Sequence, residues 1–226
     1  MTDQRTRFLS SFSGFSYKLK SKKPLKIKGL VRNSWFETNS FYWPDVVSAL
    51  HGRFGEHLNC IEVGTYEGKA AIYILDHMVG ESGSLVVIDP MLDEYKATFK
   101  SNLDIHPKKH MASLLEGDSV QILPTLLKEN AEKFHFIYID AGKSAADNLL
   151  NLLVGERLLA NGGIMIVDDY LWGQNQEFST DPRCRPNLGV QLFSQVTLLC
   201  LELPVPRQQA AFSKVRANSL LVKIND

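Results

Sequence analysis

Cysteine is scarce in this chain, and long apolar runs are absent. The 226 residues contain three cysteines, Cys60, Cys184 and Cys200, which is an odd number without the spacing of a disulfide framework. No apolar run approaches the roughly 20 residues of a membrane span. The charged N-terminus also lacks the apolar stretch of a secretory signal. We therefore expect a cytoplasmic protein with no membrane contact.

Several catalytic signatures are also missing. The six histidines show no metal-ligand spacing, and the sequence contains no nucleophile elbow or Ser-His-Asp order. Formal net charge is zero, so a nucleic-acid-binding protein is the least favoured class. We therefore read the histidines and the three cysteines as structural residues.

The neutral average hides a basic N-terminal segment. Residues 1–32 hold nine Lys or Arg and only Asp3 as an acid, whereas the rest of the chain holds sixteen basic and twenty-four acidic residues. We expect residues 1–43 to form a basic, aromatic-rich arm or lid and residues 44–226 to form one domain. The arm is a solvated leader, or it contacts an acidic substrate, a nucleic acid or an anionic surface. The aromatic stretch 35–43 either packs on the domain or walls a substrate pocket.

From residue 59 onward, apolar strand-like runs alternate with helical segments. Strands are expected near 60–63, 85–88, 112–115, 134–139 and 163–167. Helices are expected near 44–53, 69–79, 92–103, 120–129 and 149–159, the last closed by Asn161-Gly162-Gly163 as a C-cap. Two final strands, 196–203 and 220–224, should pair as an antiparallel hairpin because Pro204 and Pro206 prevent a helix between them. The pattern predicts a doubly wound, Rossmann-like α/β sheet of seven strands, mostly parallel, with a C-terminal antiparallel hairpin.

Carboxylates follow two strands of this predicted sheet. Asp140 ends the strand 134–139, and Asp168 and Asp169 end the strand 163–167. Ligands bind such sheets outside the carboxyl ends of the strands, so these acids should converge on one crevice. Three acids in one crevice repel each other unless a cation lies between them, which predicts a cation site. The alternative is that a strand-end Asp caps a helix or joins an ion pair.

A glycine turn follows the first strand and precedes a helix. Gly64 and Gly68 have the spacing G-x-x-x-G, which differs from the G-x-G-x-x-G of a dinucleotide site. Glu62 adds negative charge beside the turn and therefore suits a cationic ligand. Asp89, at the end of the next strand, is placed for ribose hydroxyls, and 118–119 (Asp-Ser) could hold an adenine edge. Together these residues outline a nucleoside with a cationic end, a description that S-adenosylmethionine fits.

The chain resembles the class I S-adenosylmethionine-dependent methyltransferases from about Cys60 to Gly173. Five segments carry the resemblance, in the family's order and spacing: IEVGTYEGKAAIYIL, LVVIDP, GDSVQILPTL, FIYIDAGK and GGIMIVDDYLWG. Within the family the chain is similar to the cation-dependent catechol and caffeoyl-CoA types and to related small bacterial enzymes with a DGSH-type motif. The resemblance implies cofactor-binding residues along the first four segments, with Asp140 beside the cofactor: Glu62, Gly64, Thr65, Tyr66, Gly68, Asp89, Asp118, Ser119 and Asp140.

The same resemblance implies a metal and a base. Asp140, Asp168 and Asp169 match the ligands of Mg²⁺ or a similar divalent cation, which would bind two substrate oxygens. Lys143 matches the general base, with a pKa depressed by the cation and by partial burial. The chain departs from plant-type relatives at Gly142, where those carry an acid, and the DGSH-type group has a histidine where Lys143 stands.

The expected function is a divalent-metal-dependent O-methyltransferase of a small hydroxylated molecule. One alternative is a metal-independent O- or N-methyltransferase of the same fold. Another is a non-catalytic module that binds nucleic acid through the basic arm. A small molecule is the expected partner, and a homodimer is the assembly we considered.

Overall fold

The computed structural model describes residues 35–172, 181–197, 200–203, 205 and 208–215. Residues 1–34, which include the basic segment 1–32, and the expected strand 220–224 lie outside these ranges, so the basic part of the arm stays a prediction. In the described part, no helix combines the length and the apolar character that a membrane crossing requires.

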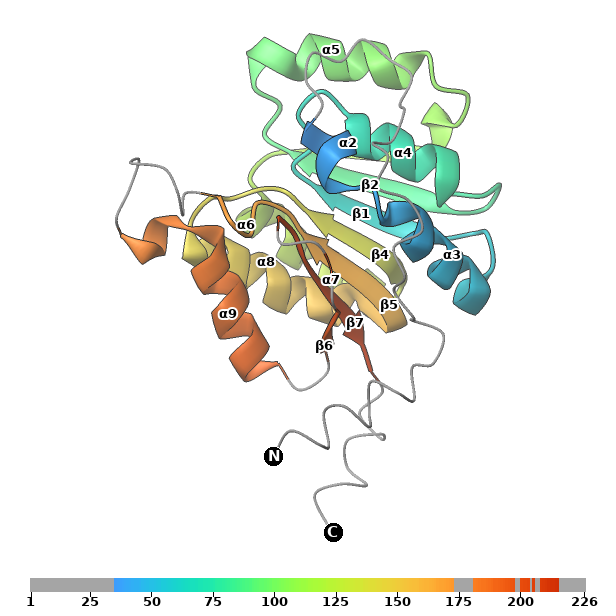
Figure 1. Cartoon of the computed structure of the whole chain (residues 1–226). Coiled ribbons are helices and arrows are strands. Elements are labelled where there is room, and N and C mark those ends of the chain that lie inside the picture. Colours follow the sequence, from blue (N-terminus) through green and yellow to red (C-terminus); the bar gives the residue numbers. More distant parts are fainter. Residues whose placement is uncertain (1–34, 173–180, 198–199, 204, 206–207, 216–226) are drawn as a thin grey trace.

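A seven-stranded sheet forms the centre of the molecule (Figure 1). Its order is β3 (Ala112–Glu116), β2 (Ser84–Asp89), β1 (Asn59–Val63), β4 (Phe134–Ile139), β5 (Leu159–Val167), β7 (Ala210–Lys214) and β6 (Cys200–Leu203). The first five strands are parallel, and β7 runs antiparallel to both of its neighbours. The expected mostly parallel α/β sheet with an antiparallel C-terminal strand is therefore confirmed. The chain order reverses between β1 and β4, which is where such sheets bind ligands.

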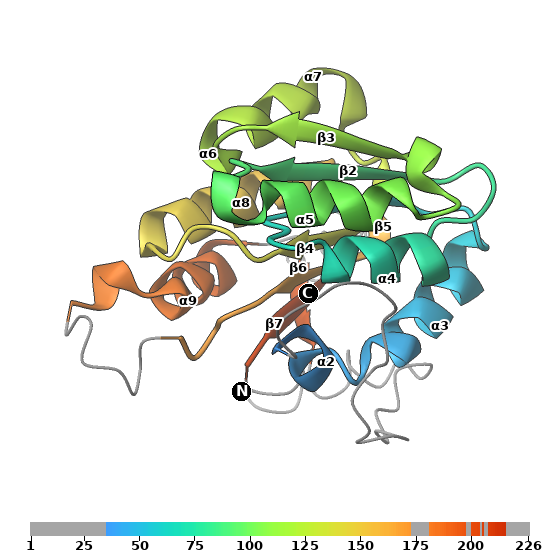
Figure 2. The same cartoon turned by 90° about the horizontal axis from the view of Figure 1, so that it is seen from above.

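Helices cover both faces of the sheet (Figure 2). One face carries α2 (Trp35–Asn39), α3 (Trp43–Phe54), α4 (Lys69–His77) and α5 (Asp93–Asp104). The other carries α6 (Ser119–Ile122), η2 (Leu123–Leu126), α7 (Leu127–Asn130), α8 (Ala145–Leu158) and α9 (Pro186–Val196). Two short 3₁₀ turns, η1 (Lys109–Met111) and η3 (Pro182–Cys184), complete the elements. Alternate strand residues enter two separate cores, as Phe136 and Ile137 of β4 show.

An aromatic cluster fixes the N-terminal helices to the sheet. Trp43 is fully buried, and its ring lies edge-on to four others with centroid distances of 4.9 Å to Phe36, 5.5 Å to Tyr73, 5.2 Å to Phe136 and 4.9 Å to Tyr138. Edge-to-face contacts of this kind add to the free energy of burial. The aromatic stretch 35–43 thus packs on the domain, and the same packing holds α2 above the sheet ends.

The boundaries that we predicted for the C-terminal hairpin were wrong. Helix α9 continues to Val196, β6 begins only at Cys200, and the strand that pairs with it is β7, in a stretch that we expected to be a loop. The sequence AAFSK of β7 lacks a strand-like pattern, yet all five residues are buried between β5 and β6. Burial in the sheet overrides weak intrinsic preference here.

Two helix predictions also needed correction. The single helix expected at 120–129 is three short pieces, because Pro124 lies in the 3₁₀ turn η2. The stretch Asn161-Gly162-Gly163 does not cap a helix but lies within β5, where Gly162 has φ +85°. The register of β5 against β4 shifts at this irregular end, and Arg53 Nη1 donates to the Gly162 carbonyl at 2.6 Å.

A buried hydrogen-bond network joins the N-terminal helices to the end of β5. The Tyr42 hydroxyl and the Trp43 indole donate to Gln209 Oε1 at 2.5 and 3.4 Å. The Gln209 amide in turn donates to Asp168 Oδ2 at 2.9 Å, and Tyr138 donates its hydroxyl to the same oxygen. Gln209 is 3% exposed, so water cannot replace these partners. This single amide therefore connects α3, β7 and the carboxylate of Asp168.

Replacing Gln209 by alanine should destabilise the protein by about 1–3 kcal/mol, because buried polar groups of Tyr42 and Asp168 lose their partner. Urea unfolding followed by circular dichroism measures this. Gln208→Ala is the matched control, since Gln208 is the exposed neighbour and its substitution should change the free energy of unfolding by less than about 0.5 kcal/mol. Equal effects of the two substitutions would contradict the structural role of the network.

Candidate active site

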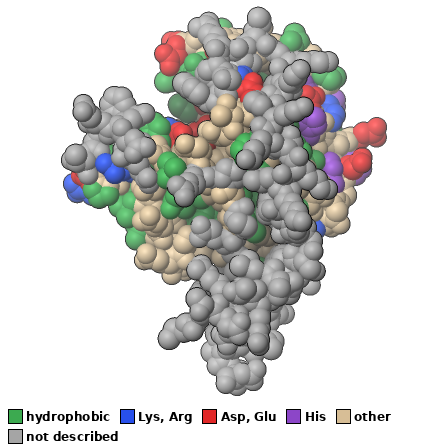
Figure 3. Space-filling view, viewed as in Figure 1, with side chains coloured by type: hydrophobic (Ala, Val, Ile, Leu, Met, Phe, Trp, Pro, Cys, Tyr) green, Lys and Arg blue, Asp and Glu red, His purple; other side chains and the backbone are tan. Residues whose placement is uncertain are grey.

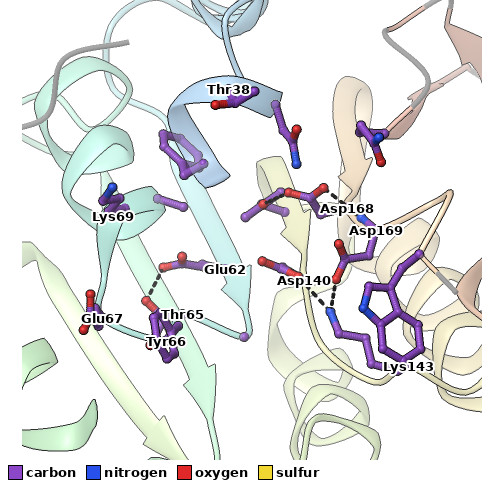
Figure 4. Close-up of a pocket in the computed structure, with 17 residues that line it drawn as sticks. Thr38, Glu62, Thr65, Tyr66, Glu67, Lys69, Asp140, Lys143, Asp168 and Asp169 are labelled. Atoms are coloured by element: carbon purple, nitrogen blue, oxygen red, sulfur yellow. Dashed lines mark hydrogen bonds and ion pairs between the residues drawn. The ribbon is translucent and has the colours of Figure 1, made fainter. Parts of the chain in front are cut away.

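A cavity of about 650 Å³ lies at the carboxyl ends of β1, β4 and β5. Figure 3 shows acidic side chains beside a recess on this face, and Figure 4 shows the side chains that line it. The lining comes from α2, the turn after β1, the start of α4, the ends of β4 and β5 and the loops that follow them. Eight residues expected at the site line this cavity: Glu62, Gly64, Thr65, Tyr66, Asp140, Lys143, Asp168 and Asp169.

The turn after β1 brings backbone to the cavity. Gly64 has φ +82°, and an added Cβ would collide with the carbonyl oxygen of Asp140, so a side chain is excluded there. Gly68, with φ +90°, then starts α4, and its amide donates to Thr65 O at 2.9 Å. Tyr66 has φ +51°, which is strained for a bulky residue. Strain of this kind is common where a ligand must approach the backbone.

Glu62 carries an unpaired oxygen into this cavity. Its side chain is fully buried; Oε2 accepts from the Thr65 hydroxyl at 3.0 Å, while Oε1 has no hydrogen-bond partner. Burial raises the pKa of Glu62 well above its ordinary value. An unpaired buried carboxylate oxygen is costly. A cationic or N–H donor from a ligand in the cavity would relieve that cost.

Asp89 lies beneath the turn, outside the cavity lining. Its carboxylate accepts four hydrogen bonds, from the amides of Thr65 (2.8 Å), Tyr66 (3.4 Å) and Met91 (2.7 Å) and from the Tyr95 hydroxyl (2.9 Å). It therefore holds the glycine turn in place. Binding ribose would require a ligand hydroxyl to displace one of these donors.

The expected adenine residues also lie outside this cavity. Asp118 caps α6 by accepting from the Val120 amide at 3.1 Å, and the Ser119 hydroxyl accepts from Asn151 at 3.1 Å. Gly68 is likewise absent from the lining. The roles of these residues in cofactor binding stay predictions.

The carboxylates of β4 and β5 do converge, and a lysine lies with them (Figure 4). Lys143 Nζ is 3.2 Å from Asp140 Oδ1 and forms a closer ion pair with Asp169 Oδ2. Asp168 is set apart, because its Oδ2 accepts from Tyr138 and Gln209 and its Oδ1 accepts from the Asp169 amide at 2.7 Å. The cluster thus consists of the Lys143 ammonium between the carboxylates of Asp140 and Asp169. The third carboxylate, that of Asp168, does not pair with the lysine and instead accepts hydrogen bonds from Tyr138, Gln209 and a backbone amide.

The expected divalent cation stays a prediction, and the arrangement of these side chains does not favour it. Oxygen ligands of this type suit Mg²⁺, but the described residues contain no group of three His, Cys, Asp or Glu arranged to hold a metal ion. The Lys143 ammonium lies between the two carboxylates that a cation would share. Asp168 Oδ2 already accepts from Tyr138 and Gln209, and its Oδ1 accepts from a backbone amide.

The electrostatics of the cluster differ from expectation at Lys143. Burial alone would lower the pKa of Lys143, but the carboxylates of Asp140 and Asp169 outweigh it and raise the pKa above its ordinary value. We had expected a depressed pKa. Burial raises the pKa of Asp140; Lys143 opposes this rise and the nearby Asp168 and Asp169 add to it. The lysine is therefore held as an ammonium, and the Asp140 carboxylate is more basic than that of an ordinary Asp.

Several lining residues were not expected from the sequence. Phe36, Thr38 and Asn39 of α2 close one side of the cavity, and Tyr138 and Gln208 contribute from β4 and from the loop before β7. Only the density of aromatic residues in 35–43 indicated that α2 would take part. Lys69, the first residue of α4, also lines the cavity and pairs with Glu37 of α2 at 2.7 Å, with both side chains nearly buried. This ion pair fastens α2 over the glycine turn.

Comparison with known proteins agrees with the fold. A family described as a methyltransferase domain matches residues 61–170. Tricin synthase 2 of Oryza sativa subsp. japonica is 31% identical over 128 residues, which cover 54% of this chain and 41% of that protein. O-methyltransferase hkm8 of Aspergillus hancockii is 26% identical over 109 residues, covering 48% and 41%. The chain thus spans less than half the length of these curated relatives.

A solved structure shows the same fold. The O-methyltransferase TomG from Streptomyces achromogenes, in complex with S-adenosylmethionine, superposes with a TM-score of 0.57 at 19% identity, covering 76% of this chain and 80% of that one. The matched region 61–170 contains the glycine turn, Asp89 and all three carboxylates of the cluster. On these grounds the region 61–170 is a methyltransferase domain of the S-adenosylmethionine-dependent type, related to the caffeoyl-CoA O-methyltransferase-like enzymes.

Proposed function

We propose that this protein transfers the methyl group of S-adenosylmethionine to a hydroxyl oxygen of a small molecule. The observation that carries the proposal is one cavity that joins two features: the unpaired carboxylate oxygen of Glu62 beside the glycine turn, and the Asp140–Lys143–Asp169 cluster at the next strand ends. The first suits the cationic end of the cofactor, and the second suits an acceptor that must lose a proton. The O-methyltransferase relatives support an oxygen acceptor.

The cofactor half of the site follows from the turn after β1. Glu62 Oε1 would accept from the methionine ammonium of the cofactor, and Gly64 lets the ligand approach the backbone. Thr65 and Tyr66 border the same space. Asp89 would bind the ribose by exchanging the Tyr95 hydroxyl for a ligand hydroxyl. Asp118 and Ser119, at the end of β3, would contact the adenine.

The acceptor half lies between α2 and the strand ends. Phe36, Thr38 and Trp172 line this side and would surround a small, planar molecule. A lone pair of the acceptor oxygen attacks the methyl carbon as the carbon–sulfur bond breaks, so the sulfonium becomes a neutral thioether. In this proposal the hydroxyl proton passes to Asp140, because Lys143 is held protonated by its carboxylates. Positioning of the two reactants supplies most of the rate enhancement.

Metal dependence is the second candidate for the same site. The three carboxylates Asp140, Asp168 and Asp169 at adjacent strand ends favour it by residue type. A bound Mg²⁺ would polarise the acceptor hydroxyl. The Lys143 ammonium lies between two of these carboxylates, so no step above uses the ion. A single domain from residue 44, a cytoplasmic location and a homodimer stay predictions; Cys60, Cys184 and Cys200 are free thiols.

The proposed reaction is tested directly by methyl transfer. The full chain, incubated with S-adenosylmethionine labelled in its methyl group and a panel of small phenols and aliphatic alcohols, should yield labelled ethers with S-adenosylhomocysteine as coproduct. Mass spectrometry of the products identifies the methylated atom. Label appearing only on nitrogen acceptors would contradict an oxygen-directed reaction.

Glu62→Gln should weaken S-adenosylhomocysteine binding by at least about tenfold, because a hydrogen bond between charged groups contributes about 1.5–3 kcal/mol. Isothermal titration calorimetry measures the change. Glu81→Gln is the control, because Glu81 is an exposed acid between α4 and β2. If both variants bind like the unmodified protein, Glu62 does not contact the cofactor.

A further inference from the structure

We propose that the Lys143 ammonium is the resident cation of this site, taking the place of a divalent metal ion and binding the reacting oxygen of the acceptor. The inference rests on the proposed methyl transfer and specifies how its acceptor is held. In this inference Lys143 is the cationic group between the ends of β4 and β5.

The position of Lys143 is the first observation. Its Nζ contacts Asp140 Oδ1 at 3.2 Å and pairs closely with Asp169 Oδ2, so it joins the ends of β4 and β5 (Figure 4). A metal shared by these two carboxylates would need the same space. An ammonium and a divalent cation repel each other at such short range. The two occupants therefore exclude one another.

The hydrogen bonds that Asp168 accepts are the second observation. A three-carboxylate metal site needs an oxygen of this residue, but Tyr138, Gln209 and the Asp169 amide already donate to its two oxygens. Asp168 is 6% exposed and the Gln209 amide is itself fastened by Tyr42. A metal ion on Oδ2 would displace Tyr138 or Gln209 and so disturb a buried network that reaches the start of α3. The network holds this carboxylate as part of the scaffold.

The loop before Lys143 is the third observation. Gly142 has φ +71°, and an added Cβ would lie 2.8 Å from Asp147 Cβ, so a side chain there forces the loop to shift. The Gly142 carbonyl accepts from the Asn148 amide, and the Ser144 hydroxyl accepts from the Asp147 amide at 3.1 Å, which fixes the loop on α8. The glycine is therefore the residue that lets Lys143 turn back onto the carboxylates.

The hydrogen-bonding capacity of Lys143 defines the acceptor. An ammonium has three donors, and the described residues supply two acceptors, Asp140 and Asp169. The third donor serves the acceptor oxygen, because Lys143 lines the cavity and is 42% exposed. A chelating metal would require a pair of neighbouring oxygens on the acceptor, whereas an ammonium needs one. We therefore expect acceptors with a single hydroxyl to be methylated as readily as vicinal diols.

The chemical balance of the step is simple. The acceptor oxygen forms a bond to the methyl carbon, the sulfonium takes the electron pair of the broken carbon–sulfur bond, and the hydroxyl proton passes to a carboxylate of the cluster. Lys143 keeps its proton and stabilises the negative charge that develops on the oxygen.

The test is Mn²⁺ binding, measured by electron paramagnetic resonance on the full chain saturated with S-adenosylhomocysteine. At equal concentrations of about 100 µM metal and protein, a range in which a site of micromolar affinity would be largely filled, the free Mn²⁺ signal should remain unchanged. EDTA should leave methyl transfer within about twofold of its original rate. A stoichiometric loss of the Mn²⁺ signal together with activity abolished by EDTA would overturn the inference.

Variants of Lys143 complete the test. Lys143→Ala should lower kcat by about 100-fold or more, as loss of an electrostatic donor does, with S-adenosylhomocysteine affinity within about threefold, since Lys143 contacts the acceptor and not the cofactor. Lys143→Arg should restore part of the rate because it keeps the charge. Lys96→Ala, a surface lysine paired with Glu116, is the control. Full activity in Lys143→Ala would also overturn the inference.

These outcomes separate the two proposals. A chain that binds no S-adenosylhomocysteine and transfers no methyl group would refute the proposed function itself. A chain that binds the cofactor, transfers the methyl group and requires Mn²⁺ would keep the proposed function and refute only the role of Lys143 as the cation.

Discussion

The repulsion among carboxylates at the ends of β4 and β5 is the constraint on which this site depends. Parallel pairing of the two strands brings Asp140 and Asp168 to the same edge of the sheet, and Asp169 follows directly. Such a group is stable only if each charge has a partner. The protein meets the requirement with its own side chains: Lys143 for Asp140 and Asp169, and Tyr138 with Gln209 for Asp168.

Unusual backbone conformations make that solution possible. Asp169 has φ +57°, a region that aspartate tolerates better than most residues, and its amide donates to Asp168 at 2.7 Å. Gly142 has φ +71° and returns Lys143 to the cluster, while Gly64, with φ +82°, keeps the opposite side of the cavity open. The pairing of β4 with β5 brings the residues at their ends close together. These three positions decide which side chains face one another.

The elements with strong local patterns could be predicted from the sequence. Strand β4 begins and ends at the expected residues, and β1 and β2 differ by about one residue at an end, because their apolar runs are bounded by clear turn residues. Convergence of the three carboxylates also followed from sequence, since it requires only that the two strands be parallel neighbours. Features of this kind depend on local pattern and on topology.

Features that depend on long-range contacts could not be predicted. Strand β7 has no strand pattern and exists because β5 and β6 bury it. Gln209 gave no signal, since its partners are separated from it by 41 to 167 positions along the chain. The ion pairs of Lys143 with Asp140 and Asp169 were also not predicted. The neighbours of Lys143 are set by the turn at Gly142, which the sequence shows only as a glycine between Ala141 and Lys143.

The central claim is that one cavity binds the cofactor at Glu62 and the acceptor at the Lys143 cluster. A crystal structure of the full chain with S-adenosylhomocysteine tests it most directly. The account predicts cofactor density in the cavity, with the methionine ammonium at hydrogen-bond distance, about 3 Å, from Glu62 Oε1 and the sulfur directed toward Lys143. Cofactor density elsewhere on the sheet, with Glu62 Oε1 still unpartnered, would contradict it.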